Sequence, residues 1–389
     1  MMIAKAEAVQ DYVVALRRDL HRNPELSGQE FKTRERLMKE LDALGISYEK
    51  IATTSLVARI NPGKGGRSVA LRADIDALPI IEQSGVDFCS TNPGVMHACG
   101  HDAHAAMLMG AAKILVAMKD ELPGEVRLIF QEAEETLSGA RRVVAGGGID
   151  GIETAFGLHG MSTLATGEYD LTPGFRMAGC DTIFVKFEGE SGHAGAPHLA
   201  RDTINPACVF TANLNSVVAR DVDPLEPLVL SVGRFSGGTK ANIVAKYTEL
   251  DISMRYYDAN VRTTAHEAIQ RHAAAIAEAF RVKVTVKIEE SAISLYNDDA
   301  MTAIAARAAE KVFGPGKNKG HARMMGSEDM PYYFQKARGA YALLGFRNEA
   351  KGSIYFPHNE KFLLDEDYFK YGVALHAQVA VDFLQSQTS

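Results

Sequence analysis

The chain has 389 residues, of which 46% are hydrophobic and 23% charged, and its formal net charge is −7. This length exceeds what one hydrophobic core ordinarily supports, so we expect two domains in a soluble globular protein. The negative charge argues against nucleic-acid binding, which needs a basic face. No apolar run reaches the roughly 18 residues of a membrane span. Four cysteines without paired spacing, and an N-terminus without a signal-peptide core, lead us to expect a cytoplasmic protein.

The first half of the chain alternates helical and strand-like segments, which predicts a mostly parallel sheet with helices on both faces. Apolar residues recur three and four positions apart between Ala6 and Leu20, as on one face of a helix. We expect Asp102 to cap a long apolar helix that ends near Lys119. The other segments are a helix over 33–44, strands over 55–60, 68–73, 126–130 and 154–158, and a helix over 138–145.

Polar residues follow three of these strands. Asp74 and Asp76 come at the end of the strand over 68–73, Glu134 and Glu135 follow 126–130, and His159 follows 154–158. Open α/β sheets place ligands beyond the carboxyl ends of their strands. We therefore expect these side chains to share one site.

The second half of the chain has a different rhythm. A strand, helix, strand, strand, helix and strand are predicted over 182–187, 202–219, 228–235, 245–255, 259–280 and 282–288. This order is the ferredoxin-like arrangement, which can fold alone. The α/β pattern then resumes with a helix over 299–313, a strand over 340–345 and a helix over 365–385. We expect a catalytic domain over 1–178 and 291–389, interrupted by a lid or dimerisation domain over 179–290.

Potential metal ligands occur in four separate segments, which contain Cys99 with His101, the pair Glu134 and Glu135, His159, and His358. Taken singly, each has an ordinary explanation as a buried cysteine, a loop or core histidine, or solvated surface charge. Two adjacent carboxylates after an apolar strand repel each other unless a cation lies between them. Cysteine and histidine suit Zn²⁺ or a neighbouring transition metal. Together these segments predict a hydrolytic site with two metal ions.

Longer motifs around these residues resemble the M20 metallopeptidase family. The segments 72–79, 96–104 and 131–135 are most similar to its amidohydrolase branch, which contains hippurate hydrolases, N-acyl-amino-acid aminoacylases and auxin-conjugate hydrolases. The segments 192–198, 237–242 and 326–329 extend the resemblance, which covers the chain from Leu20 to His358.

The resemblance implies two divalent metal ions per subunit (Zn, Mn, Co or Ni). It places Glu134 at the position of the general base, and it suggests that Asp76 orients the site from behind the ligands. A turn or helix-capping carboxylate is the alternative for Asp76. The implied metal ligands are Cys99, as the bridge, with His101, Glu135, His159 and His358.

The resemblance also assigns residues of the second domain. His193 matches a histidine that polarises the substrate carbonyl, in dimeric relatives from the partner subunit, and the alternative is a turn histidine. Asn242 and Arg255 match positions that bind the carboxylate of the substrate, and an exposed strand arginine is the alternative for Arg255. A homodimer or homotetramer is implied. No roles are assigned to His97, His104 and His198, for which core or supporting positions are expected.

The function predicted from these features is metal-dependent hydrolysis of the amide bond of N-acyl-amino acids, of the hippurate or N-acetyl-amino-acid type. The alternatives are a dipeptidase or carboxypeptidase of the same family, or a catalytically inactive relative that binds ligands. The complete ligand set and the intact Glu134 argue against the inactive relative. The segments after His358 and His193 depart from the usual family pattern, so the acyl and amino-acid preferences stay open.

Overall fold

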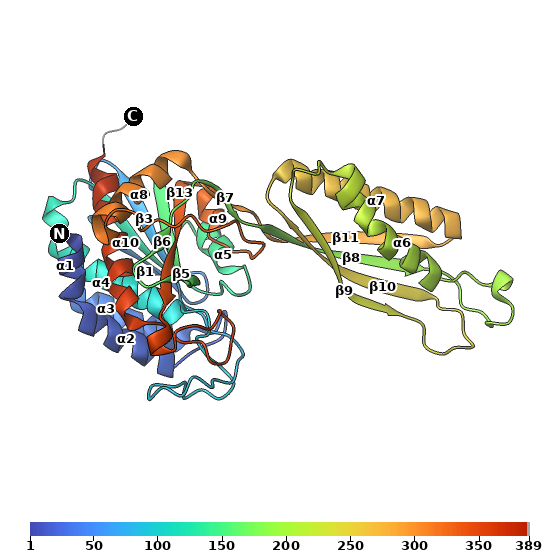
Figure 1. The fold of residues 1–389 in the computed structure, drawn as a ribbon, viewed down its shortest axis with the longest axis horizontal. Coiled ribbons are helices and arrows are strands. Elements are labelled where there is room, and N and C mark those ends of the chain that lie inside the picture. Colours follow the sequence, from blue (N-terminus) through green and yellow to red (C-terminus); the bar gives the residue numbers. More distant parts are fainter. Residues whose placement is uncertain (387–389) are drawn as a thin grey trace. The chain divides into compact units, whose positions relative to one another are not determined.

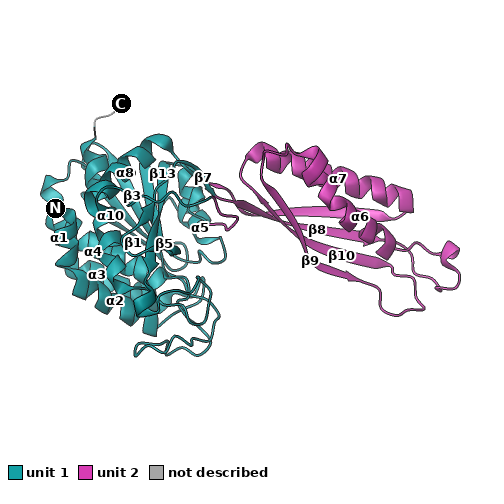
Figure 2. Ribbon diagram, in the orientation of Figure 1, with its two compact units in different colours: residues 1–176, 296–322, 329–389 teal, residues 177–295, 323–328 magenta. Residues whose placement is uncertain are grey.

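The computed structural model describes residues 1–386, which separate into two compact units (Figure 2). Within these residues, unit 1 comprises 1–176, 296–322 and 329–386, and unit 2 comprises 177–295 and 323–328. Unit 2 thus consists of two segments, a long one and a short one, that interrupt the sequence of unit 1. Within the described residues, no helix combines the length and the apolar character needed to cross a membrane.

A seven-stranded sheet forms the centre of unit 1 in the described part of the chain (Figure 1). Its four central strands, β4, β3, β5 and β13, are parallel to one another, and antiparallel strands complete both edges, which confirms the predicted fold class. In sheet order the strands are β1 (Ser47–Ile51), β2 (Ser55–Ile60), β4 (Glu125–Gln131), β3 (Ser68–Asp74), β5 (Thr154–Ala165), β13 (Arg338–Arg347) and β6 (Tyr169–Asp170). Both β3 and β4 are buried along almost their whole length, as expected for strands covered on both faces.

The helices of unit 1 cover this sheet. They are α1 (Met2–Glu7), α2 (Gln10–Arg22), α3 (Phe31–Leu44), α4 (His101–Ala117), α5 (Gly139–Ala145), α8 (Asp299–Phe313), α9 (Pro331–Phe334) and α10 (Phe369–Gln385). Helix α4 packs against α2, α10 and β3 and is buried almost all round. A Cβ atom at Gly110 would lie 2.7 Å from Val13 and 2.8 Å from Val373, so glycine permits this close packing. A separate pair of strands consists of β7 (Gly174–Met177) and β12 (Leu295–Asn297).

The start of α4 differs from the prediction. Gly100 is the N-cap, with φ of 93°, and the helix begins at His101, so the expectation that Asp102 caps this helix is wrong. The buried carboxylate of Asp102 instead accepts hydrogen bonds from Arg17 Nε at 2.8 Å and from His21 Nδ1 at 2.7 Å. Asp102 thereby ties α4 to α2. Sequence spacing carries no signal for such a long-range pair.

Strand β5 is longer than predicted. It continues past residue 158 to Ala165, so His159 lies within the strand and not beyond its end. Strand β3 pairs with β5 only as far as Arg72 opposite Gly157, whereas β13 remains paired beyond that point. His159 therefore lies where β5 has lost one neighbouring strand, which leaves room for its side chain at the edge of the sheet.

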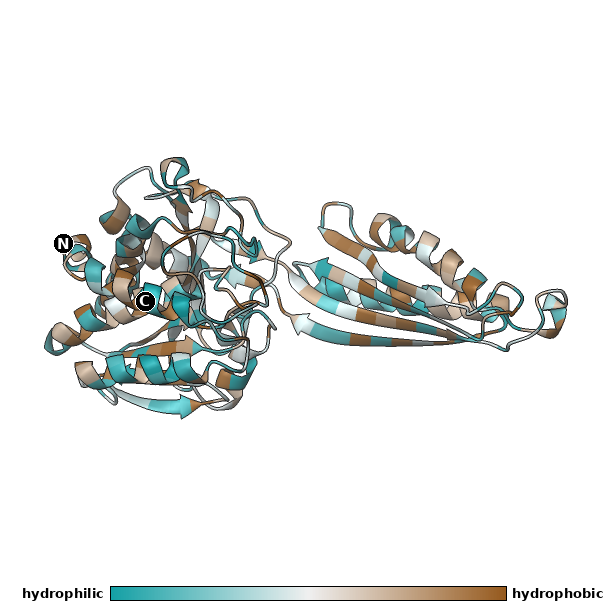
Figure 3. Ribbon diagram, turned by 90° about the horizontal axis from the view of Figure 1, so that it is seen from below, coloured by the Kyte–Doolittle hydropathy of each residue, from teal (hydrophilic) through white to brown (hydrophobic). Residues whose placement is uncertain are grey.

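Unit 2 has the predicted ferredoxin-like order β-α-β-β-α-β. Its antiparallel sheet has the strand order β11-β8-β10-β9, and α6 and α7 cover one face (Figure 1). Alternate residues of β10, including Leu250 and Ile252, are fully buried, and the alternation of hydrophobic and hydrophilic residues is visible in Figure 3. The elements are β8 (Gly179–Glu188), α6 (Ile204–Ser216), β9 (Leu228–Gly237), β10 (Tyr247–Tyr256), α7 (Ala259–Phe280) and β11 (Lys283–Ala292).

An ion pair between the buried Asp181 and the partly exposed Arg262 links β8 to α7 in unit 2. Arg262 donates two hydrogen bonds to Asp181, at 2.8 and 3.0 Å, and His266 Nε2 lies 2.7 Å from the same carboxylate. Burial alone raises the pKa of Asp181, but the hydrogen bonds from His266 and Arg262 outweigh it and hold the pKa below its usual value. The charged form of Asp181 therefore stabilises the fold of unit 2.

We expect Asp181→Asn to destabilise the protein by about 1–2 kcal/mol, because it weakens the charge-assisted hydrogen bonds of this buried carboxylate while Arg262 keeps Glu290 as a partner. The contribution is present above about pH 4, the unfolded pKa of an aspartate, and is lost as the pH falls through the lower folded-state pKa. Urea unfolding of both proteins at several pH values should show the difference shrinking in acid. Asp251→Asn, which removes the exposed partner of Arg234, is the matched control and should have little effect at any pH.

Candidate metal centre

Side chains from four segments meet at the carboxyl ends of the central strands of unit 1. The loop before α4 and the first residue of that helix supply two of them, the turn after β4 supplies two, and β5 and the loop after β13 supply one each. These side chains are the ones that the sequence predicted to share a site: Cys99, His101, Glu134, Glu135, His159 and His358.

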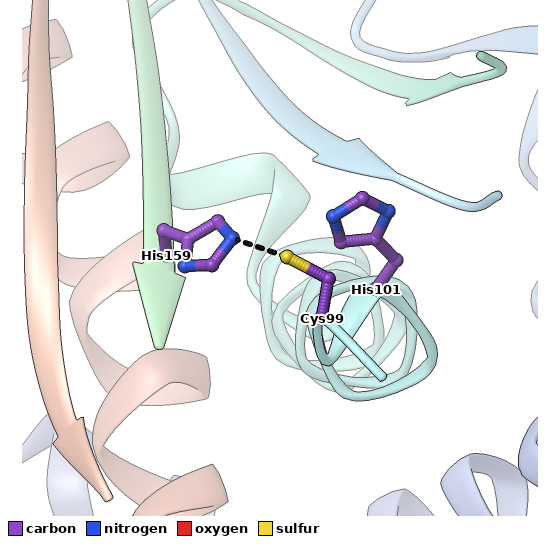
Figure 4. A group of neighbouring side chains, drawn as sticks. All are labelled: Cys99, His101 and His159. Carbon is purple, nitrogen blue, oxygen red and sulfur yellow. Dashed lines mark hydrogen bonds between the residues drawn. The ribbon is translucent and has the colours of Figure 1, made fainter. Parts of the chain in front are cut away.

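Two of the groups of potential ligands share Cys99. In the first group, which also contains His101 and His159, the ligand atoms all lie within 4.8 Å of one another (Figure 4). Cys99 Sγ is 3.3 Å from His159 Nε2. The second group, formed with Glu135 and His358, satisfies the same limit, and His358 Nε2 is 3.3 Å from Glu135 Oε2. Each group could hold one metal ion, and the shared thiol would then lie between two ions.

Two of the histidines present one ring nitrogen to the centre and use the other as an anchor. His159 Nδ1 is 2.7 Å from the carbonyl oxygen of Gly160, and His101 Nδ1 is 3.1 Å from Asp76 Oδ1. These contacts assign the proton to Nδ1 in both rings, which leaves Nε2 as the ligand atom. Metal-binding histidines are commonly anchored in this way. His101 Nε2 and Glu135 Oε1 are buried without a hydrogen-bond partner among the described residues, as expected of atoms arranged to bind a cation.

Asp76 connects two of the ligand segments. Its Oδ1 atom faces His101, and its Oδ2 atom accepts hydrogen bonds from the backbone N–H of Glu135 at 3.0 Å and from the Ser27 hydroxyl at 2.7 Å. Burial raises the pKa of Asp76, but these hydrogen bonds outweigh it and lower the pKa overall. Asp76 caps no helix in the described part of the chain, and its contacts suit the orienting position that the sequence suggested for it.

His104, to which the sequence motifs gave no role, lies directly behind the centre. Its Nδ1 atom is 2.6 Å from Asp74 Oδ1, and its Nε2 atom accepts a hydrogen bond from the backbone N–H of Gly160 at 3.1 Å. Arg72 in turn lies 2.6 Å from the other oxygen of Asp74. This chain of buried groups fixes the part of β5 that carries His159. In the sequence, the spacing of Arg72 and Asp74 along β3 indicates that these two side chains can pair, because strand residues two apart face the same side of the sheet.

The other two unassigned histidines lie apart from these hydrogen bonds. His97 is buried, neither of its ring nitrogens has a hydrogen-bond partner among the described residues, and burial lowers its pKa to about 4. His198 is an exposed residue of unit 2. Neither residue is among the candidate ligand groups found in residues 1–386.

The electrostatics of the cluster favour added positive charge. Burial and the nearby carboxylate of Glu135 raise the pKa of the Cys99 thiol, and they outweigh the opposing effects of His101 and His358. Hydrogen bonds to Cys99 and Glu135 raise the pKa of His358 to about 10. Burial lowers the pKa of His159 to about 3, so this imidazole remains neutral and available as a ligand. A divalent cation would supply the charge that Cys99 and Glu135 require, so the donor set fits metal binding.

The remaining predicted site residues lie in unit 2. His193 is exposed, and its Nδ1 atom accepts a hydrogen bond from the backbone N–H of Gly195 at 3.0 Å, which assigns the ring proton to Nε2. Asn242 is also exposed, and its backbone oxygen accepts a hydrogen bond from Ala194 at 3.1 Å. Arg255 Nη1 donates to the Ser327 hydroxyl at 2.7 Å. The imidazole of His193 therefore offers a free N–H donor to an incoming molecule.

Comparison with known proteins identifies the family. The model of peptidase family M20/M25/M40 matches residues 70–382. Thermostable carboxypeptidase 2 of Saccharolobus solfataricus is 38% identical over 385 residues, which cover 96% of each chain. The N-acetyl-L-cysteine deacetylase of Bacillus subtilis is 36% identical, over 92% of this chain and 85% of that protein. The crystal structure of a dinuclear metal-binding M20 peptidase from Bacillus subtilis superimposes with a TM-score of 0.86 at 31% identity, covering 97% of this chain and 99% of the other.

The fold, the donor cluster and these matches define the class of protein. The chain belongs to peptidase family M20/M25/M40, which confirms the resemblance seen in the sequence motifs. It is accordingly a hydrolase of amide bonds.

Proposed function

We propose that this protein is a metal-dependent amidohydrolase that cleaves N-acyl-amino acids into a carboxylic acid and a free amino acid. The observation that carries the proposal is the pair of donor groups that share Cys99, with Glu134 beside them. Relatives with printed names such as N-acetyl-L-cysteine deacetylase and N-acyl-L-amino acid amidohydrolase support this substrate class. The proposed ligands of two divalent ions, from among Zn, Mn, Co and Ni, are Cys99, His101, Glu135, His159 and His358.

When bound, the ions would supply Lewis acidity, which favours deprotonation of water and stabilises negative charge on a carbonyl oxygen. In the proposed mechanism Glu134 accepts the proton of the attacking water and passes it to the leaving amine. His193 donates its Nε2 proton as a hydrogen bond to the carbonyl oxygen. Asn242 and the planar guanidinium of Arg255 bind the carboxylate of the amino acid.

Carboxypeptidase activity is the second candidate, because the matched proteins also include a thermostable carboxypeptidase at 38% identity. A peptide with a free C-terminus is itself an N-acyl-amino acid whose acyl group is a peptidyl group. The two reactions therefore share the leaving group and differ only in the acyl side. Release of free amino acid from N-acetyl-amino acids, N-benzoyl-amino acids, dipeptides and longer peptides distinguishes them. Faster turnover of the peptides than of the simple acyl substrates would overturn the first choice in favour of the second.

We also propose that the protein is a homodimer or homotetramer assembled through unit 2. Strand β9 is at the edge of its sheet and exposes the apolar side chains of Val229 and Phe235. Ile243 and Tyr247 add to the exposed apolar surface of this unit. Edge strands of this kind readily pair with another chain.

Replacing the proposed base tests the mechanism. Glu134→Gln should retain the fold and the bound metal but lose turnover by roughly 10²- to 10⁴-fold, because the amide cannot accept the proton. Circular dichroism checks the fold, metal analysis checks the bound metal, and steady-state kinetics measure the turnover. Glu153→Gln, at the amino end of β5, is the control and should have normal turnover. Retention of more than about a tenth of the wild-type rate by Glu134→Gln would refute the assignment.

The sharing of Cys99 predicts different metal stoichiometries for two variants. Cys99→Ala removes a donor from both groups, so it should weaken the binding of both ions. His159→Ala removes a donor from only one group, so it should lose mainly one ion. Equilibrium dialysis against Zn²⁺ or Mn²⁺, followed by elemental analysis, measures how many ions each variant binds. Cys180→Ala, at another buried cysteine, is the control and should bind metal as the wild type does. Equal losses in the Cys99 and His159 variants would contradict the bridging arrangement.

Mixing two inactive variants tests whether His193 acts across the subunit interface. Glu134→Gln and His193→Ala subunits should each have little activity alone. If His193 serves the partner subunit, random mixing of dimers should restore about a quarter of the wild-type activity, because half of the dimers are mixed and each contains one complete site. Native mass spectrometry confirms the exchange. Absence of recovery after proven exchange would place the action of His193 within its own chain.

A further inference from the structure

The turn that carries Glu134 and Glu135 contains an unfavourable backbone conformation. Ala133, directly before this pair, has φ of 51°, and Leu137, directly after it, has φ of 53°. An alanine in the left-handed region costs roughly 1 kcal/mol relative to glycine. Such a residue persists only where the surrounding structure holds it in place.

Glu30, far away in the sequence, contacts this turn directly. Its side chain is fully buried, and its Oε1 atom accepts hydrogen bonds from the backbone N–H of Ala133 at 2.9 Å and of Gly28 at 2.8 Å. Its Oε2 atom accepts a hydrogen bond from the Thr54 hydroxyl. Every polar contact of this carboxylate is therefore with the strained turn or with the two segments packed beside it.

The residue before Ala133 is fixed from the same place. Glu132 is fully buried, and its carboxylate accepts hydrogen bonds from the backbone N–H groups of Thr54 and Ser55. It also lies 2.8 Å from the Thr54 hydroxyl, whose single proton is shared between Glu132 and Glu30. Thr54 therefore contacts both carboxylates. Glu30 and Glu132 hold the backbone that leads into the Glu134–Glu135 pair, and Asp76 holds the second member of the pair through the backbone N–H of Glu135.

We propose that Glu30 is a positioning residue that holds Ala133 in its left-handed conformation and thereby orients Glu134 and Glu135. This inference rests on the proposed function, in which these two residues are the general base and a metal ligand. Glu30 acts through the backbone of Ala133 and contacts none of the proposed ligands in the structure. Misplacement of a catalytic group by about 1 Å is enough to cost on the order of 100-fold in rate.

Glu30→Ala should lower kcat by roughly 10- to 100-fold with a much smaller change in KM, because the base is misaligned while the residues proposed to bind the substrate carboxylate are untouched. The kcat of Glu30→Gln should remain within about threefold of the wild-type value. Its amide oxygen can still accept from Ala133 and Gly28, and its NH₂ group can donate to Thr54, whose hydroxyl then donates to Glu132. Rescue by glutamine separates this role from a need for negative charge.

A second substitution tests the strain itself. Ala133→Gly allows the left-handed conformation without the steric cost, so it should raise kcat at least about fivefold in the Glu30→Ala background, and clearly less in the wild-type background. The kcat values of the wild type, the two single variants and the double variant give the coupling between Glu30 and Ala133. If glycine has the same effect in both backgrounds, Glu30 does not act through the conformation of Ala133 and the proposal is wrong.

Glu25→Ala is the matched control. Glu25 lies in the same loop as Glu30 and accepts hydrogen bonds from Lys32 and Thr33, but none from the turn after β4, so its loss should leave kcat near the wild-type value. If Glu30→Ala does not fold, Glu30→Asp shortens the reach by one methylene and should still lower kcat. If Glu30→Ala and Glu30→Asp both have the wild-type kcat while Glu134→Gln is inactive, the positioning role of Glu30 is wrong and the proposed function stands. An active Glu134→Gln would instead reject the proposed function.

Discussion

Negative charge concentrated at the carboxyl ends of the parallel strands is the constraint on which this structure depends. Two of the buried carboxylates have their charge balanced within the protein, Asp74 by Arg72 and Asp76 by the hydrogen bond from His101. Cys99 and Glu135 face histidines instead: Glu135 lies 3.3 Å from Nε2 of the exposed His358 and 3.9 Å from Nε2 of the buried His101. A protein that gathers these groups without a cation would be destabilised by their repulsion. The cluster is therefore most simply explained as a site for metal ions.

The supporting contacts show why the site is built on this fold. Some candidate ligands are held by a buried group from a different element, as His101 is by Asp76 and as the backbone after His159 is by His104. Parallel strands bring the ends of several segments together at one edge of the sheet, so short side chains can reach one another. The cost of the arrangement is local strain, and it is found at Ala133 and at His358, where φ is 68°. His358 is held in turn by its backbone N–H, which donates to Ala98 at 2.7 Å.

Much of this organisation could be predicted from local patterns. Hydrophobic periodicity located most helices and strands, and α7 was predicted with its observed ends at Ala259 and Phe280. The family motifs brought the candidate ligands into one site. Local patterns failed where distant residues decide the outcome. The length of β5 depends on its pairing with β13, Asp102 is committed to Arg17 and His21, and the bonding of Glu30 to Ala133 joins residues 103 positions apart.

The division of the chain into two units suggests how related enzymes acquire different substrates. The proposed chemistry at Glu134 and the metal ligands needs only an amide carbonyl and an amine leaving group, so it does not distinguish an acetyl group from a peptidyl group. Discrimination must come from residues that contact the acyl side or the carboxylate. The proposed substrate-binding residues, His193, Asn242 and Arg255, all belong to unit 2. Substitution of Asn242 or Arg255 can therefore change the preference for the amino-acid part of the substrate without disturbing the buried charges of unit 1.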